Sequence, residues 1–205
     1  PGYKELSVGN HLFMTIQWML SSFANEGKAF FIAIWAAGFL LLVKSKKAKV
    51  YQSLAVVFSV VALLPYAGIS FFSEMGIGYI DIEQCLTELP TWQTMTTQNR
   101  IAFFWWIAAV LFTLVLLWKV TGHSVFISMA FLGGIASEAV LHFSPTIYAS
   151  GARVYYLTDL MYLFIILWMV MRMDSEKKKN LFIAGAAALG IINFLSQYSI
   201  MLLKL

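Results

Sequence analysis

Long apolar runs separated by short polar segments limit what this chain can fold into more than any other feature of its sequence. Six runs meet or approach the roughly 20 residues that a helix needs to cross a bilayer; they cover residues 29–43, 50–72, 101–118, 124–143, 154–171 and 181–203. The sequence therefore predicts an all-α fold, a polytopic transmembrane bundle of about six spans. The shorter stretch 11–23 contains Gln17, so we expect it to form an N-terminal interfacial helix or a helix packed on the bundle.

The composition supports a lipid environment. Sixty per cent of the 205 residues are hydrophobic and 12% are charged, and the mean hydropathy is +0.78. A soluble globular protein of this composition would have far too little polar surface. No long polar segment interrupts the apolar runs, so we expect residues 1–205 to form a single transmembrane domain. Because no secretory leader precedes the first polar stretch, we expect a piece of a longer protein.

The positive charges gather in short clusters beside apolar runs. They lie between the first and second runs, after the third and after the fifth, and an alternating path through six spans puts these three loops on one side. The loop 73–99 falls on the other side and holds four acidic residues and no lysine. The positive-inside rule then places the lysine-bearing loops in the cytoplasm and the acidic loop outside. This arrangement accounts for the net charge of +4 and argues against a nucleic-acid partner.

Motifs for metal or cofactor binding are missing from the sequence. The single cysteine, Cys85, excludes an internal disulfide and a cysteine-based metal cluster, and we find no paired-histidine motif or glycine-rich phosphate loop. We therefore expect no metal site and no cofactor.

Small residues and tryptophans within the apolar runs have structural explanations. Close helix contact is expected at the glycines of the fourth and sixth runs, which are Gly133, Gly134, Gly185 and Gly190. We expect Trp105 and Trp106 to belong to an aromatic belt at the outer membrane boundary.

Two acidic residues, Glu138 and Asp159, fall inside apolar runs, where an ionisable group costs at least a few kcal/mol and points to a function. Each lies five residues from the outer end of its run, so both are on the order of 7–8 Å deep at a rise of about 1.5 Å per residue. His142 is one turn from Glu138, a spacing that can tune a proton-transfer group. Asp159 shares a helix face with Tyr162. The alternative for both acids is a structural hydrogen bond to a neighbouring helix.

The segment 143–155 joins the two runs that carry these acids, and it contains Arg153, Tyr148 and Tyr155. The guanidinium of Arg153 is a rigid, permanently charged fork that suits phosphate or carboxylate. The positive-inside rule does not call for arginine on the outer side, so we expect Arg153 to bind an anionic group. The alternative is an interfacial anchor that contacts lipid headgroups or the acidic loop.

Two short motifs carry a family resemblance. Pro1-Gly2-Tyr3 at the start, and Ser144-Pro145 followed by Gly151-Ala152-Arg153, resemble the C-terminal half of a poorly characterised bacterial family of polytopic membrane proteins. That family is grouped with the GT-C glycosyltransferases, which use lipid-linked sugars. The resemblance implies a multi-pass protein of the bacterial cytoplasmic membrane. It also implies that Arg153 contacts the lipid phosphate or the acceptor, while the catalytic carboxylate lies upstream of this chain.

The leading expectation is therefore a glycosyltransferase-like membrane protein, or part of one, that handles a polyprenyl-phosphate-linked sugar or envelope glycan outside the cytoplasm. The expected substrate-binding residues are Glu138, His142, Tyr148, Arg153, Tyr155 and Asp159. A proton-coupled transporter or flippase is the first alternative, because intramembrane acids also form proton paths. A non-catalytic membrane assembly subunit is the second.

Overall fold

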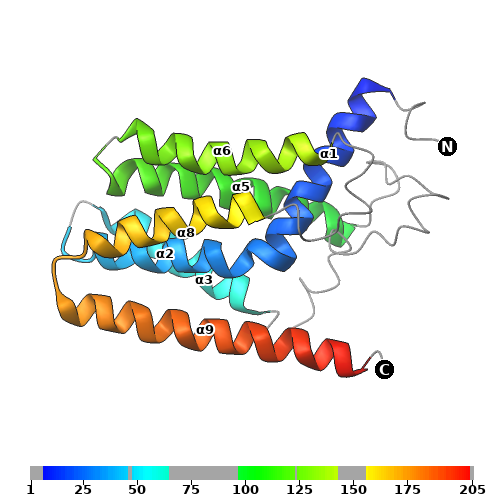
Figure 1. Cartoon of the computed structure of the whole chain (residues 1–205). Coiled ribbons are helices and arrows are strands. Elements are labelled where there is room, and N and C mark those ends of the chain that lie inside the picture. The colour runs from blue at the N-terminus through cyan, green and yellow to red at the C-terminus, as the bar shows by residue number, and fades with distance from the viewer. Residues whose placement is uncertain (1–6, 46–47, 65–96, 123, 143–155, 204–205) are drawn as a thin grey trace.

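The computed structural model describes residues 7–45, 48–64, 97–122, 124–142 and 156–203. The regular structure in these ranges is entirely helical (Figure 1). The helices are α1 Val8–Ser22, η2 Phe23–Gly27, α2 Lys28–Leu42, α3 Lys49–Leu63, α5 Thr97–Val120, α6 Val125–His142, α8 Tyr156–Met171 and α9 Glu176–Leu203. The predicted all-α fold is confirmed.

Helix α2 lies in the middle of the bundle. It packs against α3, α5, α8 and α9, and Phe31, Ile34, Trp35 and Ala37 are completely buried. The sequence of α2 is apolar on almost all sides, and such a helix lies in the core of a protein or within a membrane. The absence of a side chain at Gly38 lets α5 lie especially close to α2. A Cβ at this position would lie only 2.7 Å from Cδ2 of Leu116 on α5.

An aromatic cluster centred on Phe31 joins α2 to its neighbours. The Phe31 ring lies 5.6 Å from the rings of both Trp106 of α5 and Tyr162 of α8, and 5.9 Å from Phe131 of α6. Trp35, one turn along α2, donates a 2.8 Å hydrogen bond to Oγ1 of Thr113 on α5. Trp106 therefore belongs to the core rather than to an aromatic belt.

The N-terminal helix α1 packs on the bundle against α5 and α6, which is one of the two predicted positions. Its N-cap is Ser7, whose Oγ accepts a hydrogen bond from the amide of Asn10, 3.3 Å away. Phe13 contributes a ring contact to Phe103 of α5 at 5.7 Å. The five-residue π-helix η2 joins α1 to α2 without a break, and it marks a change of direction between them (Figure 1).

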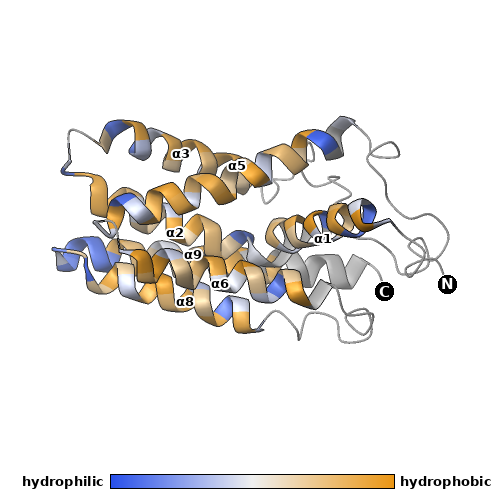
Figure 2. Cartoon of the chain, turned by 90° about the horizontal axis from the view of Figure 1, so that it is seen from above, coloured by the Kyte–Doolittle hydropathy of each residue, from blue (hydrophilic) through white to orange (hydrophobic). Residues whose placement is uncertain are grey.

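The turns that carry lysine lie together at one end of the bundle, as the alternating path requires. In both Figure 1 and Figure 2 the α2–α3, α5–α6 and α8–α9 connections share this end, which we call the lysine end. Asp174 receives ion pairs from Lys44 at 2.7 Å and from Lys178 at 2.9 Å, so it ties the α2–α3 turn to α9. Gln52 of α3 also donates to the carbonyls of Leu42 and Ser45.

One described helix, α5 over Arg100–Val120, is long and apolar enough to cross a membrane. Four further apolar helices are shorter, namely Lys28–Leu42, Lys49–Leu63, Val125–Val140 and Tyr156–Met171. The structure thus gives weak support for membrane association through α5, and the six spans remain a prediction.

Removal of the Asp174 carboxylate is expected to loosen the lysine end. The hydrogen bonds from Lys44 and Lys178 hold the pKa of Asp174 well below its ordinary value. A lowered folded-state pKa adds stability above the unfolded-state value of about 3.9, and this stability is lost as the pH falls further. We expect Asp174→Asn to lower the thermal midpoint in detergent by a few degrees at pH 7.

The difference between wild type and Asp174→Asn should shrink as the pH is lowered from 4 to 2. Glu176→Gln is the matched control, because the ion pair of Glu176 is with Lys179 on the same helix α9. A difference that stayed constant over this pH range would show that the two ion pairs do not stabilise the fold.

Candidate functional site

Glu138 is an acidic side chain buried in the helical bundle. It lies on α6, four residues before that helix ends, and is 1% exposed. Phe131, Gly134 and Glu138 are spaced by three and four residues, so they share the face of α6 that meets α8. Burial of a carboxyl group is costly unless other groups compensate it, so this position is chemically significant.

Tyr162 of α8 is the second member of the site and is also 1% exposed. Its ring lies among those of Phe30, Phe31 and Phe131, at 5.6–6.0 Å. Its hydroxyl group is buried and makes no hydrogen bond within the described part of the chain. Buried hydroxyl groups normally have a partner, so this phenol retains an unused capacity to bond.

Asp159 completes the group. It lies in the first turn of α8, three residues before Tyr162, and its side chain is partly buried. Glu138 and Asp159 both act electrostatically on the Tyr162 phenol. Two carboxyl groups from different helices thus lie within electrostatic range of one buried hydroxyl. We call Glu138, Asp159 and Tyr162 the acid–phenol cluster.

A tight crossing of α6 and α8 positions this cluster. A Cβ at Gly134 would lie 3.5 Å from both Cβ of Met161 and Cε1 of Tyr162. Thr158 donates to the Gly134 carbonyl at 3.1 Å, and Ser137 donates to the same carbonyl at 2.7 Å. The two hydroxyls are 3.2 Å apart. Close packing at a small residue together with hydroxyl bonds between helices is typical of membrane helix pairs.

The cluster lies toward the end of the bundle opposite the lysine end. Glu138 is close to the last residue of α6 and Asp159 close to the first residue of α8, and α1 packs against α6 at this end (Figure 1). The depth predicted for both acids was five residues from the ends of their runs; in the structure Glu138 lies four residues before the end of α6 and Asp159 three residues after the start of α8.

The described structure does not include the side chains of the other predicted site residues. His142 is the last residue of α6. Arg153, Tyr148 and Tyr155 lie outside the described residues, as does Cys85.

Tyr162 and Thr158 were not among the predicted site residues. Tyr162 was marked only by its spacing of three from Asp159, and an apolar helix offers no pattern that reveals which side is buried. Thr158 looked like an ordinary hydroxyl residue, because its partner Gly134 lies 24 residues away in the sequence.

The polar side chains of this cluster are two carboxyl groups and a phenol. Within the described ranges, no three histidine, cysteine, aspartate or glutamate side chains gather as metal ligands. A carboxyl and a hydroxyl inside an apolar bundle can bind a polar group or hold and transfer a proton.

No protein-family model, curated protein or solved structure matches this chain. A functional assignment therefore rests on the residues and their geometry, and the resemblance to GT-C glycosyltransferases stays a prediction.

The crossing itself can be tested at Thr158. Thr158→Val keeps the side-chain shape but removes the bond to the Gly134 carbonyl, so we expect it to lower the unfolding free energy by about 1 kcal/mol. Thr158→Ser keeps the hydroxyl and should lower the unfolding free energy by less. Thermal unfolding of the three proteins in detergent measures this order. An equal loss in both variants would assign the stabilisation to the methyl group instead.

Proposed function

We propose that this chain is a multi-pass membrane protein of the bacterial cytoplasmic membrane, with the lysine end in the cytoplasm. The outward faces of its long helices support this proposal. They expose large apolar side chains, including Val57 on α3, Leu111 on α5, Met129 on α6, Leu160 on α8 and Ile183 on α9. Soluble proteins rarely expose apolar surface on this scale.

The shorter apolar helices are compatible with this placement. Helices of 15 to 18 residues cross a bilayer when it thins locally or when flanking lysine side chains extend to the headgroups. The lysine end supplies such side chains, and the positive-inside rule sets its orientation.

Cysteine labelling tests the topology. In a Cys85→Ser background, Ser45→Cys places a thiol on an exposed residue at the lysine end, and Thr97→Cys places one at the opposite end, where α5 begins. An impermeant maleimide should label Thr97→Cys in intact cells, but Ser45→Cys only after the membrane is opened. Labelling of both residues from the same side would contradict a membrane-spanning bundle.

We further propose that the acid–phenol cluster belongs to a site for a lipid-linked sugar at the extracytoplasmic end, as in a glycosyltransferase-like protein. The observation that carries this proposal is the buried Glu138, which together with Asp159 acts electrostatically on the buried Tyr162 phenol. Carboxyl and phenol groups hydrogen-bond to sugar hydroxyls. We assign these groups to binding and not to bond-making.

Arg153 supplies the complementary charge in this proposal. It precedes α8 by three residues in the sequence, and the segment that contains it joins the two helices of the cluster. Its guanidinium makes two parallel bonds to a phosphate group, whereas lysine offers a point charge. The substrate would thus present its phosphate to Arg153 and its sugar to Glu138 and Asp159.

Tyr162→Phe separates binding from folding. The Tyr162 hydroxyl is buried without a hydrogen bond among the described residues, so its removal should leave the thermal midpoint unchanged or raised. We expect Tyr162→Phe, Glu138→Gln and Arg153→Lys each to weaken binding of a polyprenyl-phosphate-linked hexose at least tenfold, or about 1.4 kcal/mol. Binding is measured on the purified full chain in detergent.

Tyr51→Phe is the control, because Tyr51 lies on α3 near the lysine end. Wild-type affinity in all three site variants would contradict the sugar-binding site. Loss of folding in Glu138→Gln alone would mark Glu138 as a structural residue.

A proton-coupled transporter or flippase is the second candidate, and the observation that favours it is that two carboxyl groups act electrostatically on one buried phenol. Intramembrane acids of this kind form proton relays. In proteoliposomes with an imposed pH gradient, this function predicts proton uptake that Glu138→Gln abolishes and Arg153→Lys does not. The absence of both sugar binding and proton uptake would favour a non-catalytic assembly subunit.

A further inference from the structure

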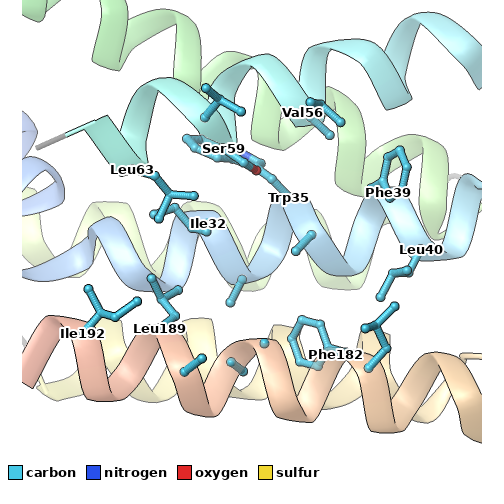
Figure 3. A pocket seen from close by; sticks show the side chains of 18 residues that line it. Ile32, Trp35, Phe39, Leu40, Val56, Ser59, Leu63, Phe182, Leu189 and Ile192 are labelled. Atoms are coloured by element: carbon cyan, nitrogen blue, oxygen red, sulfur yellow. The ribbon is translucent and has the colours of Figure 1, made fainter. Parts of the chain in front are cut away.

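A groove separates α3 from α9, with α2 as its floor. Its volume is about 510 Å³, within the range of about 300–1,000 Å³ found for small-molecule sites. In Figure 3 the side chains of Val56 and Leu63 on α3 face those of Phe182 and Ile192 on α9 across the groove.

The lining is almost wholly apolar. Ser59 and Trp35 contribute its polar side-chain atoms, and the Trp35 ring nitrogen already donates to Thr113. A polar ligand would lose its bonds to water here and gain almost none. The chemistry of the groove therefore selects a hydrocarbon.

The dimensions of the groove match one lipid chain. Its α9 side extends from residue 181 to residue 192, which is about 16 Å at a rise of about 1.5 Å per residue. One leaflet of a bilayer has a hydrocarbon thickness of about 15 Å, half of the roughly 30 Å core.

A lysine lies at or just beyond the lysine end of each helix that lines the groove. Lys44 follows the last residue of α2 by two, Lys49 is the first residue of α3, and Lys178 lies in the first turn of α9, four residues before Phe182. Asp174 is shared by Lys44 and Lys178, so the mouth of the groove carries a net positive charge.

We propose that this groove holds one hydrocarbon chain of an anionic bilayer lipid, with the lipid phosphate on the lysines at the mouth. The inference rests on the membrane placement proposed above. The cytoplasmic leaflet is the side on which basic residues meet anionic headgroups. This site lies away from the acid–phenol cluster and serves to anchor lipid, not to bind the sugar.

Two glycines of α9 provide a matched pair of variants. A Cβ at Gly185 or at Gly190 would meet nothing within 4 Å, yet Gly185 lines the groove and Gly190 does not. Gly185→Phe therefore fills the groove, while Gly190→Phe adds the same ring to the same helix outside it.

The experiment uses the full chain in detergent and native mass spectrometry with dioleoyl phosphatidylglycerol and dioleoyl phosphatidylcholine as probes. We expect wild type and Gly190→Phe to retain phosphatidylglycerol at least tenfold better than phosphatidylcholine. Gly185→Phe should lose retention of both lipids at an unchanged thermal midpoint. The double variant Lys44→Gln and Lys49→Gln should retain both lipids equally.

Wild-type retention by Gly185→Phe would overturn the site, as would equal loss in both glycine variants. Equal retention of the two lipids by wild type would overturn the role of the lysines. Loss of self-association in Gly185→Phe, with lipid retention intact, would assign the groove to a second copy of the chain. The assay needs no substrate and no fixed topology, so its failure is distinguishable from failure of the labelling or sugar-binding experiments.

Discussion

The central position of α2 is the constraint on which the rest of this structure depends. Phe31 and Trp35 have no exposed surface, and α3, α5, α8 and α9 each cover a part of the helix. The position of α8 against Phe31 fixes where Tyr162 meets the carboxyls of the cluster. The separation of α3 from α9 on another side of α2 leaves the groove. Both candidate sites are thus consequences of how one helix is surrounded.

Polar side chains inside the bundle fall into two kinds. Thr113 accepts from Trp35 and donates to the Ala109 carbonyl at 2.7 Å, and Thr158 likewise bonds to its neighbours. These groups use their hydrogen bonds to fix helix positions. The Tyr162 hydroxyl contributes no such bond in the described structure, although it lies near two carboxyl groups. This difference separates residues that hold the fold from residues that remain available to a ligand or a proton.

The apolar runs predicted the positions of the helices well, because length and polar interruptions are local properties of the sequence. They could not predict which side of each helix is buried, since a helix that is apolar all round has no preferred face. Of the expected glycine contacts, Gly134 touches α8 closely, whereas a Cβ at Gly133, Gly185 or Gly190 would have no neighbour within 4 Å. The burial of Trp106 could not be predicted for the same reason, since the sequence does not show which side of its helix faces the core. The role of Tyr162 depends on contacts between residues that lie far apart in the sequence.

The π-helix η2 has a geometric consequence for the whole N-terminal region. A π-helical turn holds an extra residue, so it rotates the helix that precedes it by about 100° relative to the helix that follows. Residues 8–42 therefore form one uninterrupted helical segment whose two halves are out of phase. The α2 half directs its apolar surface into the centre of the bundle, and the α1 half turns the same kind of surface toward α5 and α6. Because of this single phase shift, one continuous helical segment can both form the centre of the bundle and pack across the end where Glu138 lies.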